Sequence, residues 1–527
     1  MKDKNRIMKK LITLSLAFIA TTTVFAQAWT DVDHTKKLDP IKEIGYRVEM
    51  QGSFSDGKTP LWLNANKYGL SSLDKTNGYV RGAIIRQLDT DSARRWGIGY
   101  GIDMAVPLHY TSKFVVQQAF VEARWLHGVL SLGSKEYPMQ LKNNLLSSGS
   151  QTLGINARPV PQVRLALPDY WRLPFGKGWL HLKGHIAYGM MTDDGWQHDF
   201  TAKRHRYADN VLYHSKAGYL MIGNPDRFMP MSLELGLEMA CTFGGEAHLV
   251  NGTKDRIIKG GTSFKDFWHA FLPGGQDETD GLYGNIAGNQ LGSWVMRLNY
   301  DADTWAAHVY ADHYFEDHSQ MFMVDYNGYG TGEEWNVKKK RRFFLYNLKD
   351  IMLGTEINLK YGSWLRDIVF EYIYTKYQSG PYNHDRTKNI PDHIAGMDNY
   401  YNHGNYTGWQ HWGQVMGNPL YRSPIYNEDG TIRVSNNRFI AFHAGVDGSP
   451  TEHIGYRMLA TYQKGWGTYY DTYTKVHHNV SFLLEASYRF KYNWKVKGAY
   501  AMDFGGILGR NTGFQFTLSK SGLFGIR

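Results

Sequence analysis

The chain has 527 residues, of which 15% are aromatic and 56 are glycine, and its formal net charge is +10. Its single cysteine, Cys241, excludes an internal disulfide framework. After the N-terminal segment no run of about 18 apolar residues occurs, which excludes a transmembrane helix. A chain rich in Tyr, Trp and Gly without such a run fits an outer-membrane β-barrel, in which only every second strand residue is apolar.

Residues 1–26 are expected to be a secretory signal peptide. The apolar stretch LITLSLAFIA follows five basic residues, Lys2, Lys4, Arg6, Lys9 and Lys10. Val24-Phe25-Ala26 supplies the small residues of a cleavage site, and the apolar stretch is too short to span a membrane. Residues 27–43 would then be a short periplasmic segment, followed by the barrel over 44–527. We therefore expect the protein at the Gram-negative cell surface, in the outer membrane, after cleavage of the signal peptide.

Alternation of apolar and polar residues with a period of two predicts the strands. In SLELGLEMACTF (232–243) every second residue from Leu233 to Phe243 is apolar, except that cysteine stands at 241. Glu234 and Glu238 fall on the opposite face and need water, which a barrel lumen provides. The expected strands lie near 44–52, 80–88, 97–105, 114–126, 129–133, 162–168, 179–190, 217–223, 231–243, 291–300, 304–311, 344–359, 364–376, 438–446, 454–463, 478–490, 494–503 and 512–524.

The connections between these strands fall into two classes by length. With the N-terminus in the periplasm, every second connection is mostly short, as at His127-Gly128 and 301–303. Short periplasmic turns with long extracellular loops are the expected asymmetry of bacterial barrels. We therefore predict an all-β fold, a transmembrane antiparallel β-barrel of about 18 strands; the alternative is a secreted soluble all-β protein with a second layer over each apolar face. The long connections are 53–79, 134–161, 191–216, 244–290, 312–343 and 377–437.

Two of the long loops carry residues suited to binding a sugar. Loop 134–161 presents amides and a guanidinium, and the proline at 159 pushes Arg158 toward an extended backbone that projects its side chain. A fixed guanidinium donates to several oxygens at once, and aromatic rings stack on the C–H faces of a sugar. Loop 377–437 interleaves such rings with polar residues. We predict glycan contacts at the extracellular mouth by Asn143, Asn144, Asn156, Arg158, Tyr406, Trp409, His411 and Trp412.

Two alternatives stay open for these residues. The rings of 377–437 could pack a core for that loop, which an ordered loop of this length requires. Arg158 could pair with Glu234 or Glu238 on the lumen wall and fix its own loop. In either case the residue would stabilise the loop rather than bind a sugar.

A resemblance to a known family adds to this reading. The stretch NNLLSSGSQTLGINARPVPQVRL (143–165) resembles the signature region of the Wzi-like capsule assembly family, and TPLWLNANKYG (59–69) and YYNHGNYTGWQHWGQVMGNPLY (400–421) look like other parts of it. The resemblance implies a lectin-like outer-membrane barrel that binds or organises capsular or other exopolysaccharide and is not an enzyme. Characterised relatives carry an N-terminal helical bundle, for which residues 27–43 are too few. The plugging or docking role of that bundle is therefore not carried over.

Other features bear on partners and chemistry. The basic run KKKRR (338–342) is either a solvated charge run or a site that attracts lipopolysaccharide phosphates or an acidic glycan. We expect exopolysaccharide, outer-membrane lipids and lipopolysaccharide as partners, and no nucleic acid; the sequence identifies no partner in the export machinery. No ordered Ser–His motif indicates an enzyme. No metal or cofactor is expected, because no short ligand spacing occurs among His384, His393, His403 and His411.

A function of another class also stays open, that of a porin or a substrate-selective channel for small solutes or oligosaccharides. A lumen enclosed by 18 strands is wide enough to conduct. Loops 134–161 or 377–437 could instead fold inward and occlude it. Conductance across a planar bilayer separates these two functions.

Overall fold

The structure is a computed structural model that describes residues 39–91, 95–224, 229–251, 254–274, 287–316, 321, 332–337, 349–378, 383–384, 393–394 and 398–524. The predicted signal peptide and most of the predicted periplasmic segment lie outside these residues, as does the basic run 338–342.

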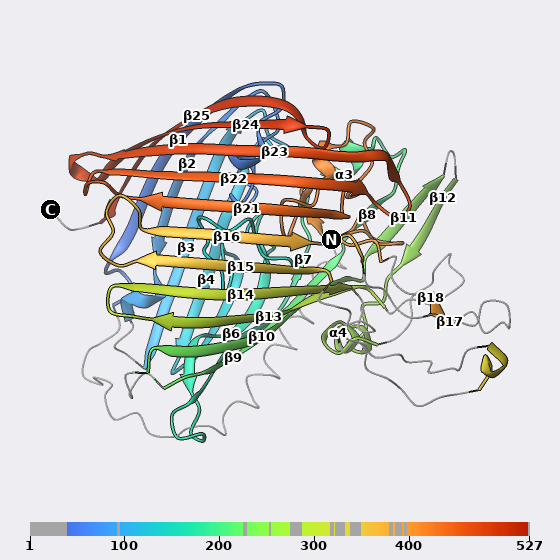
Figure 1. The fold of residues 1–527 in the computed structure, drawn as a ribbon, viewed down its shortest axis with the longest axis horizontal. Helices are drawn as coiled ribbons and strands as arrows, with labels where there is room; N and C mark the ends of the chain where they lie inside the picture. The colour runs from blue at the N-terminus through green and yellow to red at the C-terminus, as the bar shows by residue number, and fades with distance from the viewer. Residues whose placement is uncertain are drawn as a thin grey trace.

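One closed sheet of 18 antiparallel strands forms the barrel (Figure 1). Each strand pairs with its neighbours in chain order, and β1 closes the ring by pairing with both β2 and β25. The predicted number and order of strands are confirmed. The strands are β1 (Ile44–Asp56), β2 (Thr76–Arg86), β3 (Trp96–Leu108), β4 (Val115–Trp125), β5 (Gly128–Ser134), β6 (Gln162–Arg172), β7 (Leu180–Met190), β9 (Leu212–Ile222), β10 (Met231–Phe243), β13 (Asn289–Asp301), β14 (Trp305–Glu316), β15 (Ile351–Leu359), β16 (Asp367–Tyr374), β21 (Phe439–Gly448), β22 (Ile454–Gly467), β23 (Thr472–Arg489), β24 (Trp494–Gly505) and β25 (Gly509–Leu523).

The outer surface of the wall is apolar and its inner surface is polar. In β25 Phe514 and Phe516 are 61% and 52% exposed, whereas Gln515 between them is 5% exposed. In β10 Leu235 is exposed and Glu238 is buried inside, as the alternation predicts. An exposed apolar wall of this kind faces lipid, so the barrel is a transmembrane barrel of the outer-membrane type. Among the described residues no helix is both long and apolar enough to cross a membrane.

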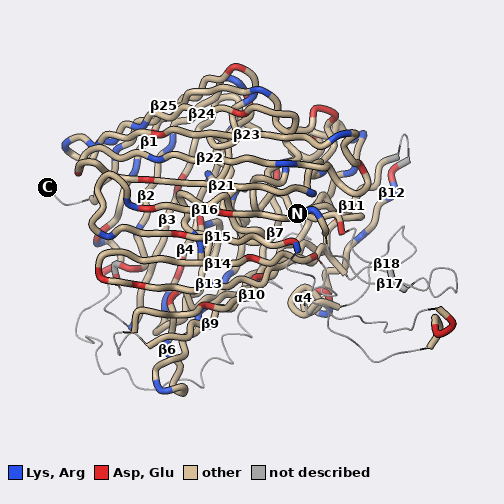
Figure 2. The backbone as a smooth tube through the Cα atoms, viewed as in Figure 1, with Lys and Arg blue, Asp and Glu red and all other residues tan. Residues whose placement is uncertain are grey.

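Charged residues occur along the strands as well as in the turns (Figure 2). Because the outward positions are mostly apolar, charges in the middle of the wall face the lumen. Arg81 and Asp103 form such a pair, with 2.5 Å between Nη2 and Oδ2, and Arg47 reaches the same carboxylate at 2.8 Å. Charged side chains of the wall therefore face the lumen at fixed positions, where a segment inside the barrel can pair with them.

The two ends of the barrel differ. Short turns such as 126–127 and 302–304 lie at the end near the C-terminus, on the left of Figure 1, and the long connections lie at the other end. The predicted asymmetry of the loops is thus confirmed. The connections carry the remaining elements: α2 (Leu61–Asn64), η2 (Leu88–Asp91), α3 (Trp196–Thr201), β8 (Tyr207–Asp209), β11 (Glu246–Asn251), β12 (Lys254–Lys259), α4 (Phe264–Phe271), η4 (Gly332–Glu334), β17 (Asn383–His384), β18 (His393–Ile394), β19 (Gln410–His411), β20 (Gln414–Val415), η5 (Pro424–Tyr426) and η6 (Lys491–Asn493).

Candidate functional site

Three of the long connections turn back into the barrel and together form a plug, which we define as residues 57–75, 135–161 and 398–438. The first segment places α2 against the inner face of β23 and β24. The backbone N–H of Leu61 donates to Asp503 Oδ2 at 3.0 Å, and Trp62 Nε1 donates to Thr461 Oγ1 at 3.2 Å. These bonds fix the segment to side chains of the lumen wall.

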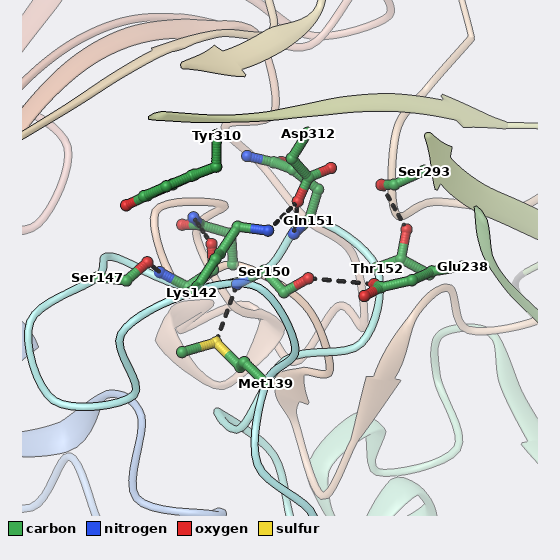
Figure 3. Close-up of polar contacts among 12 residues, drawn as sticks. Met139, Lys142, Ser147, Ser150, Gln151, Thr152, Glu238, Ser293, Tyr310 and Asp312 are labelled. Atoms are coloured by element: carbon green, nitrogen blue, oxygen red, sulfur yellow. Dashed lines mark hydrogen bonds and ion pairs between the residues drawn. The ribbon is translucent and has the colours of Figure 1, made fainter. Parts of the chain in front are cut away.

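The second segment crosses the lumen beside β10, β13 and β14 (Figure 3). Lys142 Nζ lies 2.8 Å from Asp312 Oδ2, and both side chains are buried, at 1% and 0% exposed. The same carboxylate oxygen accepts the backbone N–H of Gln151 at 3.1 Å. Ser150 Oγ donates to Glu238 Oε2 at 3.3 Å. A buried charge requires hydrogen-bond or ion-pair partners. The polar residues of this segment supply those partners to the carboxylates of the wall.

Glu371 of β16 holds the start of this crossing. Its carboxylate accepts Ser147 Oγ at 2.5 Å, the backbone N–H of Ser148 at 2.8 Å and Tyr310 Oη at 2.7 Å. His443 Nε2 of β21 lies 2.8 Å from the carbonyl oxygen of Leu146. The unusual Asn- and Ser-rich composition of this loop is thus explained by its position inside a polar lumen.

The third segment supplies the aromatic core of the plug. Trp409 is 0% exposed, its Nε1 donates to the carbonyl of Thr152 at 3.0 Å, and its ring stacks on Tyr213 of the wall at 5.9 Å. Tyr401 and Tyr421 stack at 4.0 Å and are also fully buried. The three segments and the wall therefore share one hydrophobic core inside the barrel.

The three predicted asparagines use their amides within the protein. Asn143 Nδ2 donates to Glu356 Oε1 at 3.0 Å, and its Oδ1 accepts the backbone N–H groups of 145 and 146. Asn144 exchanges two hydrogen bonds with the backbone of Met139, at 2.7 and 3.1 Å. Asn156 is 2% exposed and links the first and third plug segments through the backbones of Asn66 and Val415. These residues hold the plug together.

Tyr406, Trp409 and His411 are buried as well. Tyr406 packs with Ala208 and Val211 of the 191–211 connection. His411 Nδ1 lies 2.8 Å from the carbonyl oxygen of Arg158, and Nε2 lies 2.7 Å from the carbonyl oxygen of Thr192. Burial lowers the pKa of His411, whereas the two carbonyl contacts raise it. For these three rings, the packing alternative describes the contacts observed.

Arg158 and Trp412 come together at the long-loop end. The guanidinium carbon of Arg158 lies 4.1 Å from the centre of the Trp412 ring, and Nη2 donates to Thr111 Oγ1 at 3.1 Å. Burial lowers the pKa of Arg158 to about 10. Trp412 is only half-buried. Of the eight predicted residues, Arg158 and Trp412 therefore form a pair in which part of the Trp412 ring stays accessible beside the Arg158 guanidinium.

The alternative pairing of Arg158 with Glu234 or Glu238 is wrong. Glu234 accepts Tyr170 Oη and, at 2.9 Å, Asn299 Nδ2, while Glu238 accepts Tyr219 Oη at 2.7 Å. Glu234 therefore has its partners on the wall, and Glu238 has partners on the wall and in the plug. Arg158 lies instead over Trp412, where a planar cation and an aromatic face attract each other.

A set of cavities lies between the plug and the short-turn end, lined by residues that the sequence did not single out. A cavity of about 300 Å³ is bounded by the second plug segment and by β4 to β7 and β9. Arg164 lies 4.0 Å above the Tyr137 ring and Lys183 lies 4.3 Å above Tyr170. Alternation along β6 and β7 places Arg164 and Lys183 inward, but no motif in the sequence indicates that they share a cavity.

Comparison with known proteins shows which solved structures are similar to this barrel. No protein-family model and no curated protein matches the sequence. Among solved structures, Wzi, an outer membrane protein involved in group 1 capsule assembly in Escherichia coli and described as a carbohydrate-binding β-barrel, covers 90% of this chain and 83% of its own at 13% identity, with a TM-score of 0.53. Pseudomonas aeruginosa OprD covers 92% and 95% at 9% identity with a TM-score of 0.42. A loop-deletion mutant of Vibrio cholerae OmpT covers 91% and 98% at 8% identity with a TM-score of 0.37.

The fold is thus similar to that of Wzi. The similarity is one of architecture, since few residues are shared. It confirms the Wzi-like fold that the sequence stretches predict, and membership of the family stays a prediction.

Proposed function

We propose that the protein is a plugged outer-membrane barrel that binds and organises capsular or other exopolysaccharide at the Gram-negative cell surface, and that it is not an enzyme. The observation that supports this proposal is the plug. Its second segment is fixed by a buried ion pair and by carboxylates that each accept several hydrogen bonds. Such bonds favour a permanent part of the fold over a gate. A barrel filled in this way can hold a polymer at its outer mouth without conducting solutes.

The Arg158–Trp412 pair is the proposed contact with the glycan. A guanidinium held over a ring keeps its orientation and still presents N–H donors to hydroxyl or carboxylate oxygens. The accessible part of the Trp412 ring can stack on a sugar. The bond to Thr111 fixes the pair beside the 109–114 connection at the long-loop end. This pair replaces the broader set of eight predicted residues as the contact surface.

Substitution of the pair tests the proposal. Trp412→Ala should weaken glycan binding by about 1–3 kcal/mol, taking the scale for the stacking of a base on an aromatic ring. Arg158→Lys keeps the charge but loses the planar fork, so it should also weaken binding. The measurement is polysaccharide retained by intact cells, together with binding of purified glycan to purified protein.

Trp409→Ala is the matched control, because Trp409 is a buried ring of the same segment that has no exposed face. It should disturb heat-modifiable gel mobility, which reports folding, whereas Trp412→Ala should leave that mobility unchanged. If Arg158→Lys and Trp412→Ala fold normally and retain polysaccharide at wild-type levels, the proposed contact is wrong.

A porin or substrate-selective channel is the second candidate function. The cavity of about 300 Å³ below the plug supports it, since charged and polar residues of β4 to β7 line it. A second cavity of about 560 Å³ lies beside β1 and the end of β25. If the protein is a channel, the plug has to move before solutes can pass. Conductance across a planar bilayer would then show stable current steps.

A further inference from the structure

Three cations lie on the outer face of the barrel where β16, β21 and β22 run side by side (Figure 1). Phe442 of β21 and Tyr462 of β22 are opposed, exposed and lipid-facing. Successive side chains of a strand alternate between its faces, so Lys464 and Arg438 lie on the same outward face, nearer the long loops. Lys376 follows β16 at the same level, where its carbonyl accepts Arg438 Nε at 3.2 Å.

These cations surround two aromatic rings. Lys376 Nζ lies 4.3 Å and Lys464 Nζ lies 5.4 Å from the centre of the Trp466 ring. The guanidinium carbon of Arg438 lies 3.7 Å from the centre of the Tyr469 ring. We call Lys376, Arg438, Lys464, Trp466 and Tyr469 the rim patch. Tryptophan and tyrosine at this height of a barrel mark the boundary between hydrocarbon and headgroups.

No carboxylate of the described residues neutralises the positive charge of the rim patch. Within the described part of the chain, none of Lys376, Arg438 and Lys464 forms an ion pair with a carboxylate. Three like charges on adjacent strands repel one another unless an anion lies among them. In the lumen, by contrast, cations such as Arg81 and Lys142 have carboxylate partners. The unbalanced charge thus coincides with the surface that meets lipid headgroups.

We propose that the rim patch binds the phosphate groups of a phosphorylated glycolipid of the outer leaflet. Arginine forms paired hydrogen bonds with phosphate, and lysines add point charges around it. The rings beneath the cations hold them at headgroup depth, and the lipid-facing residues Phe442 and Tyr462 lie where the acyl chains of the same lipid would run. This site is separate from the glycan contact at Arg158 and does not depend on it.

The test uses purified full-length protein and the triple variant Lys376→Gln, Arg438→Gln, Lys464→Gln. Binding of diphosphorylated lipid A is followed by the rise in melting temperature in detergent. One Lys or Arg beside anionic headgroups contributes about fivefold to binding, so the triple variant should bind roughly 100-fold more weakly. Lys464→Gln alone should lose about fivefold, which keeps the test valid if the triple variant folds poorly.

Lys520→Gln is the matched control. Lys520 lies 5.3 Å from the centre of the Trp494 ring at the short-turn end, so it is a similar pair at the opposite membrane surface. It should bind lipid A as the wild type does. Dephosphorylated lipid A and inorganic phosphate alone should each give little stabilisation of the wild type. Equal binding by wild type and triple variant, or full stabilisation by inorganic phosphate, would overturn the assignment to a lipid headgroup.

Discussion

Lys142 is a single residue whose buried ion pair holds the plug inside the lumen. Burial alone would lower its pKa, but Asp312 and then Glu238 raise the pKa above its ordinary value, so the ammonium stays charged. Asp312 in turn has Lys142 Nζ and the backbone N–H of Gln151 as partners. Removing one member of a buried pair leaves the other charge uncompensated, which costs far more than the loss of a surface pair.

We therefore predict that Lys142→Met lowers the free energy of unfolding by about 3–5 kcal/mol. The double variant Lys142→Met, Asp312→Leu should recover much of that loss, because both charges of the pair are removed together. Urea unfolding in detergent, followed by gel mobility, measures both. Lys58 and Glu428 provide the exposed control pair, and Lys58→Met should leave stability nearly unchanged. A Lys142→Met protein as stable as the wild type would contradict the docked position of the second plug segment.

The third plug segment is an element held in part by a neutral histidine, His403. His403 Nδ1 accepts the backbone N–H groups of Asn405 and Tyr406 at 3.1 and 3.2 Å, which requires an unprotonated nitrogen. Burial, and next the charge of Arg206, lower the pKa of His403 to about 3. An unfolded histidine titrates near 6.5. Between these values the unfolded segment binds more protons than the folded one, so stability falls as the pH is lowered from about 6.5 to about 3.

The prediction is that acid loosens this segment before the barrel unfolds. His403→Asn keeps an acceptor for the two backbone N–H groups but removes the titrating ring, so its loss of stability below pH 6.5 should be shallower than that of the wild type. Other buried histidines, such as His411, leave a residual slope. Limited proteolysis of the third plug segment at pH 7 and pH 4 measures this loosening. An identical acid profile for His403→Asn and wild type would refute the role of His403.

The strands follow closely from the sequence because their outward faces must be apolar. For β10 the predicted range 231–243 is the observed one. The ends of strands that extend past the membrane were missed: β9 begins at Leu212 rather than 217, and β23 begins at Thr472 rather than 478. These extensions pair through their backbones above the lipid. No apolar alternation is required there, so the sequence carries no signal for them.

The position of the loops could not be read in the same way. Loop 134–161 was assigned a sugar-facing surface because it is polar, yet its polarity matches the lumen. Lys142 and Asp312 are 170 residues apart, and Ser148 and Glu371 are 223 apart. Alternation places Asp312 and Glu371 on the inner face but does not say whether water or a loop satisfies them. Of the predicted site residues, Arg158 and Trp412 lie together. The rings of Tyr406 and Trp409 are buried, as expected if they pack a core rather than bind a sugar.

At the scale of the whole molecule, the barrel and its plug share one core. Trp409, Tyr401 and Tyr421 of the plug pack with wall residues such as Tyr213 and Tyr314. Gly417 marks a close approach of two plug segments, where an added Cβ would lie 2.4 Å from the carbonyl oxygen of Gln151. A plug that contributes to the core in this way cannot leave without loss of stability, which distinguishes this barrel from an open channel.

Conductance of the purified protein in planar bilayers tests this closed barrel most directly. The wild type should insert without stable current steps, because the plug crosses and blocks the lumen. A variant lacking 142–152, which removes the crossing fixed by Asp312 and Glu371, should give steps and so demonstrate insertion. Large, stable and reproducible steps from the wild-type protein would contradict the account and favour a porin.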